Sequence, residues 1–288
     1  MSIDLIIQGE DVASADLRAL HTICSASGIA RIEHVAHQAF RLAGADAGSR
    51  DAVKQLCDAS NLDFAFVPSG RTLADIGLIA MDMDSTLITI ECIDEIADFI
   101  GKKSEVSTVT ARAMRGEIDW AESLRQRVSL LAGLDELALL RVYDERLALS
   151  PGAATLIDAS KKTGIKTLLV SGGFSFFTER LKARLNLDFA FANILEIVDG
   201  KLTGCVSGPL CDAAAKARHV RETRDICGLQ REQIIAIGDG ANDLQMLREA
   251  GLSIAFRAKP VVQAQTDAAI NFVGLDGVLA LFRENAKP

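Results

Sequence analysis

Basic residues, long apolar runs and paired cysteines are scarce in this 288-residue chain, and each absence excludes a class of protein. There are 31 Lys and Arg against 39 Asp and Glu, a net charge of −8. Such a balance is unsuited to binding the phosphate backbone of nucleic acids. No apolar run approaches the roughly 18 residues that span a membrane. Apolar residues still make up 49% of the chain, enough for one large globular domain or two.

Cysteine pairs with the spacing of a disulfide framework or a zinc site are also missing. The six cysteines lie singly, with no C-x-x-C among them. This pattern is typical of reduced thiols in a protein core. The first eleven residues lack the basic start and apolar stretch of a secretory signal. We therefore expect a cytoplasmic protein with a small-molecule partner and without membrane or nucleic-acid partners.

The first 75 residues have a pattern of elements of their own. Strand-like and helical segments alternate in the order β-α-β(β)-α-β, at residues 3–8, 14–27, 31–42, 50–58 and 63–67. This order predicts a small ferredoxin-like α+β domain over residues 1–75. Modules of this kind often sense amino acids, but a role in dimerisation or packing agrees with the pattern at least as well.

From residue 76 to residue 288 the pattern is that of an α/β protein. Three short apolar runs, at 78–81, 167–170 and 234–237, are separated by helical segments. Continuous apolar runs of this length are typical of buried parallel strands. The sequence therefore predicts a Rossmann-like doubly wound parallel sheet. Ligands bind such sheets outside the carboxyl ends of the strands, so the residues after the three runs should meet at one crevice.

A helical insertion is predicted between the first two runs. About 80 residues separate them, far more than one crossover helix requires. Residues 91–150 are rich in helix formers, and Ile93, Ile96 and Ile100 follow the spacing of an amphipathic helix. We predict that this segment forms a cap over the crevice.

Polar residues follow each apolar run. Asp82 and Asp84 follow the first, and alternation along an extended segment turns both to the same side. Two carboxylates so close repel each other unless a cation lies between them or one is protonated. Ser171-Gly172-Gly173 follows the second run and offers an anion cradle, and the segment from Gly238 to Asp243 follows the third and offers oxygen ligands for Mg²⁺. Helix caps and plain turns are the structural alternatives for all three segments.

Together these segments resemble the haloacid dehalogenase superfamily of phosphatases. The resemblance consists of D-x-D-x-T at Asp82 to Thr86, Ser171, Lys216, and G-D-x-x-N-D at Gly238 to Asp243. Segments around residues 82–96, 114–133 and 170–174 are further similar to the members that act on phosphoserine. The resemblance covers about residues 77–285, and the first 75 residues match an accessory domain only loosely.

The resemblance implies a Mg²⁺-dependent phosphomonoesterase that works through an aspartyl-phosphate. Asp82 would be the nucleophile, and Asp84 the general acid and then the general base. Mg²⁺ would be held by Asp82, by the backbone carbonyl of Asp84 and by Asp239. The phosphate would be bound by Ser171, Gly172, Lys216, which is also catalytic, and Asn242. Thr86 and Asp243 would support the metal and Lys216 from behind.

Substrate choice is expected to come from the cap, because the phosphate chemistry is common to many substrates. Arg127 lies on the apolar stripe of its predicted helix, where a guanidinium needs an anionic partner. The residues alone leave open whether that partner is an internal carboxylate or a substrate. The resemblance implies a substrate carboxylate, with Glu91 on the ammonium and Met114 and Trp120 as an apolar wall. By its pattern alone, Glu91 agrees equally with a solvated acidic face.

The resemblance as a whole implies hydrolysis of O-phospho-L-serine to L-serine and phosphate, the last step of serine biosynthesis. One alternative is another phosphorylated hydroxy-amino acid, or transfer to an acceptor other than water. A second is an amino-acid-binding regulatory protein with a vestigial phosphatase domain, which the complete set of acidic and basic residues argues against. The four histidines offer no rival site. The sequence leaves the choice between a monomer and a homodimer open.

Overall fold

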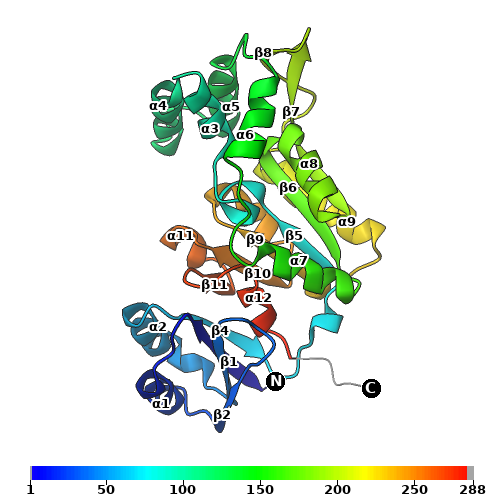
Figure 1. Ribbon diagram of the computed structural model, residues 1–288. Helices are drawn as coiled ribbons and strands as arrows, with labels where there is room; N and C mark the ends of the chain where they lie inside the picture. The colour runs from blue at the N-terminus through cyan, green and yellow to red at the C-terminus, as the bar shows by residue number, and fades with distance from the viewer. Residues whose placement is uncertain (1, 284–288) are drawn as a thin grey trace.

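The computed structural model describes residues 2–283, which form an α/β core, an inserted helical cap and an N-terminal module (Figure 1). In Figure 1 the blue module lies below the core and the cap lies above it. This arrangement confirms the predicted fold class. No helix within residues 2–283 is both long enough and apolar enough to cross a bilayer.

The module is an antiparallel sheet in the order β2-β3-β1-β4, with two helices on one face. Its elements are β1 (Ile3–Gly9), α1 (Ser14–Ile23), β2 (Gly28–Arg31), β3 (Gln38–Ala43), α2 (Arg50–Ala59) and β4 (Asp63–Pro68). Alternation along β1 turns Leu5 and Ile7 toward the helices and Ile6 toward the core of the larger domain. The helix predicted to reach residue 27 ends at Ile23, because Ser25 takes a φ of +49°, outside the right-handed helical region.

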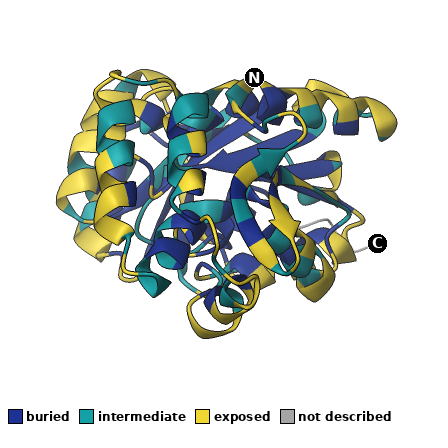
Figure 2. Ribbon diagram, turned by 90° about the horizontal axis from the view of Figure 1, so that it is seen from above, coloured by how far each residue is buried: buried dark blue, intermediate teal, exposed yellow. Residues whose placement is uncertain are grey.

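The core sheet has the order β11-β10-β9-β5-β6-β7-β8, with parallel neighbours except for the antiparallel hairpin β7–β8. Its strands are β5 (Leu78–Met81), β6 (Lys166–Phe174), β7 (Phe189–Val198), β8 (Lys201–Ser207), β9 (Ile234–Gly238), β10 (Leu252–Phe256) and β11 (Ala268–Ile270). Every residue of β5 and β9 is buried, as a continuous apolar run predicts. Figure 2 shows buried strands surrounded by helices with exposed outer faces.

Helices flank this sheet and form the cap. The core helices are α7 (Ala153–Lys162), α8 (Ser175–Leu185), α9 (Ala213–Ile226), α10 (Leu244–Leu247), α11 (Pro260–Gln263) and α12 (Gly277–Ala280). The cap helices are α3 (Cys92–Phe99), α4 (Lys103–Met114), α5 (Trp120–Ser129) and α6 (Leu137–Glu145). The two chain segments that enter and leave the cap pair with each other through an antiparallel bridge between Ile88 and Leu149.

The cysteines are free thiols, as their spacing predicted. Cys24, Cys57, Cys92 and Cys211 are buried. Cys205 is exposed on β8, so the expectation of a core thiol is wrong at that position, because alternation along β8 turns this side chain to the opposite face from the buried Leu202.

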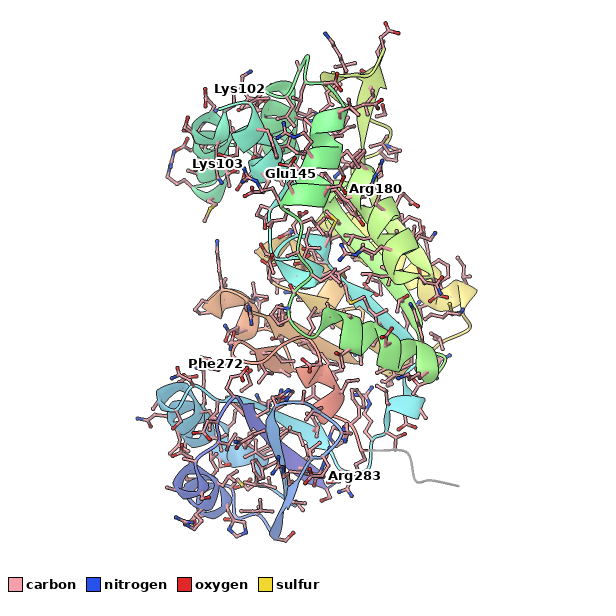
Figure 3. The ribbon with its side chains drawn as sticks, viewed as in Figure 1. Lys102, Lys103, Glu145, Arg180, Phe272 and Arg283 are labelled. Atoms are coloured by element: carbon pink, nitrogen blue, oxygen red, sulfur yellow. The ribbon has the colours of Figure 1, made fainter. Side chains whose placement is uncertain are left out.

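Buried polar contacts join the module to the core. The Asp63 carboxylate accepts hydrogen bonds from the backbone N–H groups of residues 271–273, at 2.7 to 3.1 Å. Asp4 accepts hydrogen bonds from Arg41 at 3.2 Å and from Arg283 at 3.1 Å. Figure 3 labels Phe272 and Arg283 at this junction. The module is therefore bound to the core by charge pairs and backbone hydrogen bonds as well as by apolar packing.

We expect Asp4→Asn to lower the free energy of unfolding by about 3–5 kcal/mol, because the buried Arg41 loses its charged partner. In the folded protein burial acts to raise the pKa of Asp4, but hydrogen bonds led by that from Ser69 outweigh burial and lower it. The contribution of Asp4 is therefore present above its usual pKa of 3.8 and is lost as the pH falls through the folded-state pKa. Urea unfolding at about pH 7 and about pH 3 measures both effects.

Glu33→Gln is the matched control, because the pair of Glu33 with Arg31 is exposed and should contribute less than about 1 kcal/mol. Equal losses in the two variants would contradict the role of Asp4.

Candidate active site

The polar segments that follow β5, β6 and β9 meet at one edge of the core sheet. The three strands are neighbours and run parallel, so their carboxyl ends lie side by side. A pocket of about 170 Å³ opens there beneath the cap. Its lining brings together most of the predicted site residues, namely Asp82, Asp84, Glu91, Trp120, Arg127, Ser171, Gly172, Lys216, Asp239 and Asn242. The distant segments thus converge as the strand pattern predicted.

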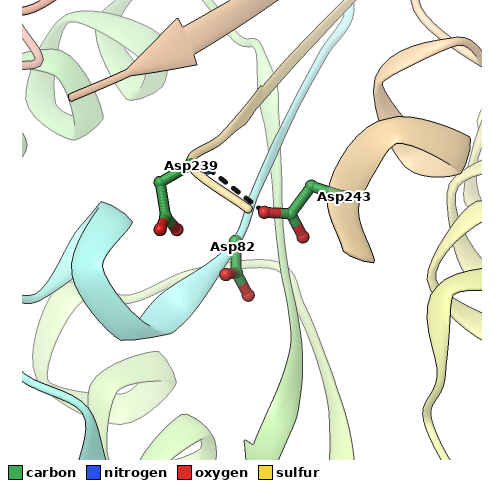
Figure 4. Close-up of side chains that lie close together, drawn as sticks. All are labelled: Asp82, Asp239 and Asp243. Carbon is green, nitrogen blue, oxygen red and sulfur yellow. Dashed lines mark hydrogen bonds between the residues drawn. The ribbon is translucent and has the colours of Figure 1, made fainter. Parts of the chain in front are cut away.

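Three carboxylates form an acidic cluster, and two of them, Asp82 and Asp239, line this pocket. One oxygen from each of Asp82, Asp239 and Asp243 lies within 4.8 Å of the others (Figure 4). The dashed line in Figure 4 is the hydrogen bond from the Asp239 N–H to Asp243 Oδ2, at 3.2 Å. Burial, and then the charge of Asp243, raises the pKa of Asp82 well above its usual value and that of Asp239 to about 6. Oxygen ligands that repel one another in this way fit a divalent cation.

Lys216 neutralises part of this negative charge. Its Nζ donates hydrogen bonds to Asp82 Oδ1 at 2.6 Å and to Asp243 Oδ1 at 2.7 Å. The side chain is 1% exposed, so this lysine does not belong to the helix surface. Burial disfavours its charge, but the two carboxylates outweigh burial and hold the pKa of Lys216 above its usual value. A permanently charged ammonium therefore lies beside the carboxylate of Asp82.

Asp84 is held in place by donors from two other elements. Its Oδ1 accepts a hydrogen bond from the N–H of Cys92 at the start of α3, at 2.9 Å. Its Oδ2 accepts one from Ser171 Oγ, at 3.4 Å. Burial is the largest cause of a raised pKa of Asp84. A side chain at position 173 would place its Cβ 2.6 Å from Asp84 Oδ2, so only glycine fits there. A carboxyl with a raised pKa is suited to donating a proton.

Thr86 supports the acidic cluster from behind. Its side chain is fully buried, and its Oγ1 donates a hydrogen bond to Asp239 Oδ1 at 3.0 Å. Asp243 is also fully buried and accepts hydrogen bonds from the N–H groups of Asp239 and Gly240. These hydrogen bonds therefore hold the carboxylates of Asp239 and Asp243 in fixed orientations.

The cap contributes one acidic and one basic side chain to the pocket. Glu91 faces the pocket and accepts a hydrogen bond from Ser85 Oγ at 2.7 Å. Partial loss of solvation among the surrounding protein atoms, followed by the charge of Asp84, raises the pKa of Glu91 to about 7. Burial lowers the pKa of Arg127, while the charges of Asp94 and Glu91 oppose that shift. Among residues 2–283, no carboxylate oxygen lies within 4.0 Å of a guanidinium nitrogen of Arg127, so Arg127 forms no ion pair there. Its guanidinium is therefore available to an anionic ligand.

The two residues predicted as an apolar wall lie in different places. Trp120 lines the pocket, and its ring approaches the Gly172 backbone. Met114 is 69% exposed at the end of α4 and is absent from the pocket lining described here. Gly116, with a φ of +75°, turns the chain just after it. The other apolar side chains of the lining belong to Ile93, Leu124 and Phe174, which were not predicted to form a wall of the site.

Ser85 is a second residue that sequence reasoning passed over. It belongs to the D-x-D-x-T run, but the run says nothing of its partner. Ser85 takes a φ of +56°, in the left-handed region that non-glycine residues rarely adopt. This conformation accompanies the hydrogen bond from its hydroxyl to Glu91, which links the loop after β5 to the cap.

Comparisons with known proteins agree with this geometry. A family model described as haloacid dehalogenase-like hydrolase matches residues 79–248, and a model described as a domain of unknown function matches residues 5–53. A curated phosphoserine phosphatase from Albidiferax ferrireducens is 52% identical over 223 residues, which cover 76% of this chain and 94% of that protein.

Two solved structures resemble nearly the whole chain. A haloacid dehalogenase family hydrolase from Salmonella enterica serovar Typhi has a TM-score of 0.88 at 35% identity, covering 98% of this chain and 99% of that one. A probable phosphoserine phosphatase from Vibrio cholerae has a TM-score of 0.82 at 38% identity, covering 96% of this chain and 85% of that one. The likeness therefore includes the N-terminal module.

We expect Mg²⁺ to raise the melting temperature of the protein, because a ligand that binds only the folded state stabilises it. Protons compete with the cation for Asp239, whose pKa is about 6. The stabilisation should therefore grow between about pH 5 and about pH 7.5, as Asp239 loses its proton. Thermal unfolding followed by fluorescence, with and without Mg²⁺, measures the shift.

Asp239→Asn should remove most of the shift, whereas Asp199→Asn, at the exposed hairpin turn, should leave it intact. A full shift in Asp239→Asn would mean that the cation binds elsewhere.

Proposed function

The chain belongs to the haloacid dehalogenase-like hydrolase family, and we propose that it hydrolyses O-phospho-L-serine to L-serine and inorganic phosphate. One observation carries the proposal. A single pocket of about 170 Å³ is lined by Asp82 and Lys216, by Arg127 and by Glu91. Phosphoserine carries a phosphate, a carboxylate and an ammonium, and each of the three groups meets a complementary neighbour there.

The cap residues account for the amino-acid part of the substrate. Arg127 can hold a carboxylate through two parallel hydrogen bonds, a geometry that a guanidinium favours. Glu91, with a pKa of about 7, becomes fully ionised when a substrate ammonium lies beside it, because an opposite charge lowers the pKa of a carboxyl. A sugar phosphate offers neither charge.

The core residues account for the phosphate chemistry in two steps. An oxygen of Asp82 attacks phosphorus, and the seryl oxygen leaves with a proton from Asp84. Asp84, now ionised, takes a proton from a water molecule, whose oxygen attacks the aspartyl-phosphate. The bond between phosphorus and the Asp82 oxygen breaks, which releases phosphate and restores the carboxylate. The raised pKa of Asp84 suits both of its roles.

Positive charge and N–H donors lower the barrier to this transfer. Lys216 lies beside Asp82, where its charge opposes the rise in the pKa of that carboxyl. It is also placed to neutralise negative charge on the phosphate during the transfer. Ser171, Gly172 and Asn242 line the same pocket. Mg²⁺, held by Asp82, Asp239 and the Asp84 carbonyl, would supply the charge that lets an anionic carboxylate approach an anionic phosphate.

The remaining parts of the proposal follow from this reaction. We further propose that this reaction is the last step of serine biosynthesis and that the enzyme works in the cytoplasm. A second candidate function, a phosphatase or phosphotransferase for another phosphorylated hydroxy-amino acid, would use the same three groups. Rates on a panel of phosphomonoesters distinguish the two. A rate on another ester that equals or exceeds the rate on phosphoserine would favour the second candidate.

We expect phosphate release from phosphoserine to require Mg²⁺ and to fall by about 10³-fold or more in Asp82→Asn, because the amide is not a nucleophile. Malachite green detection of phosphate measures the rate. Asp199→Asn, far along the β7–β8 hairpin, should keep the original rate. A rate in Asp82→Asn within tenfold of the original would remove Asp82 from the mechanism.

We expect Arg127→Ala to raise KM for phosphoserine by more than about tenfold, since the substrate carboxylate loses a charged partner. Hydrolysis of a generic aryl phosphate, which has no such carboxylate, should change much less. Arg125→Ala is the matched control, because Arg125 lies on the same helix but is exposed. Equal losses on both substrates would show that Arg127 is structural.

A further inference from the structure

The carboxamide of Asn193 is buried between the segment at the end of β6 and the segment that precedes α9. Both its nitrogen and its oxygen form hydrogen bonds. Asn193 stands on β7 and is 1% exposed. Its Nδ2 donates a hydrogen bond to the Gly172 carbonyl at 2.8 Å, and its Oδ1 accepts one from the Cys211 N–H at 2.8 Å. The partners are 21 and 18 residues away along the chain, so only the tertiary fold brings them together.

Gly172 needs this partner because β6 bulges where it reaches the pocket. The pairing of β6 with β7 runs as far as Val170 with Phe191 and resumes only at Phe174 with Asn193. Residues 171–173 of β6 therefore lie outside the regular ladder, and their backbone groups must find other partners. The amide of Asn193 supplies one to the Gly172 carbonyl. It thereby orients the Gly172 peptide, which lines the pocket.

Cys211 is important because it lies two residues before α9, the helix that carries Lys216. The next residue, Asp212, caps α9 by accepting a hydrogen bond from the Ala215 N–H at 2.8 Å. Lys216 lies in the first turn after this cap, and its N–H is bonded to the Asp212 carbonyl at 2.8 Å. The position of the Cys211 peptide therefore determines where α9 starts, and with it where Lys216 Nζ reaches Asp82.

We propose that Asn193 is a positioning residue for phosphoryl transfer, whose carboxamide holds the Gly172 peptide and the start of α9 at a fixed separation. Asn193 is not part of the pocket lining described above, so it acts through Ser171-Gly172 and Lys216 and not on the substrate itself. A carboxamide suits the place because it offers a donor and an acceptor from one rigid plane. The inference rests on the proposed phosphatase chemistry but not on phosphoserine as the substrate.

The test is Asn193→Asp, which keeps the shape but replaces the donor to the Gly172 carbonyl with a second oxygen. We expect kcat to fall by about a hundredfold on phosphoserine and on a generic aryl phosphate alike, because a misplacement near 1 Å has such a cost. KM for phosphoserine should stay within about threefold, because Glu91 and Arg127 still hold the amino acid. Asn186→Asp, at the exposed end of α8, is the matched control and should match the unmodified enzyme.

Inhibition constants separate positioning from loss of stability. Orthovanadate, whose five-coordinate adducts resemble the transition state, should bind Asn193→Asp about a hundredfold more weakly, whereas inorganic phosphate should lose no more than about threefold. Asn193→Ser, which keeps a hydroxyl donor and acceptor at shorter reach, should be intermediate in kcat. If Asn193→Asp does not fold, the kcat of Asn193→Ser tests the proposal instead.

An unchanged kcat in Asn193→Asp, or in Asn193→Ser if Asn193→Asp does not fold, would overturn the proposal. Equal weakening of vanadate and phosphate together with a lower melting temperature would do the same, since it would reveal a structural role only. A wild-type protein that cleaves the aryl phosphate but not phosphoserine would refute the proposed substrate. The comparison of variants on the aryl phosphate would still decide the role of Asn193.

Discussion

The ammonium of Lys216, buried between Asp82 and Asp243, is the interaction on which the rest of the site depends. Removing three charges from water is costly, and the arrangement is stable only when all three partners are present. The three residues come from the end of β5, the first turn of α9 and the segment after β9. The end of β5, the start of α9 and the segment after β9 must therefore meet at one place. Asp239 adds a further carboxylate to this cluster, which leaves an excess of negative charge suited to a cation.

The site is divided between the two parts of the fold according to chemistry. The groups that would act on phosphate project from the core domain, and the groups that would recognise an amino acid project from the cap. Ser85 joins the two parts, because it follows β5 and donates a hydrogen bond to Glu91. A division of this kind lets the cap vary in substrate without disturbing the phosphate chemistry.

One loop of the core, residues 271–276, contacts both the N-terminal module and the segment that leaves the cap. Asp63 of the module holds the backbone N–H groups of residues 271–273, and two residues further on the Leu275 N–H is bonded to the Pro151 carbonyl at 2.8 Å. Pro151 immediately follows the segment that leaves the cap. At Gly152, with a φ of +75°, a Cβ would lie 2.0 Å from Asp276 Oδ1, so the loop packs directly against the backbone of the cap connector. The module is thus connected to the segment from which the cap extends through this loop.

The sequence by itself determined the α/β core, the helical cap, the ferredoxin-like order of the module and the polar residues at the strand ends. Those features follow from local patterns, because strand runs, helical spacing and the D-x-D-x-T motif are written in neighbouring residues. Only the tertiary structure decided that Lys216 is buried, that Met114 lies outside the pocket lining, that the pKa of Glu91 is about 7, and that Asn193 joins Gly172 to Cys211. Each of these depends on burial or on contacts between residues far apart in the chain, and such contacts exist only once the strands have paired.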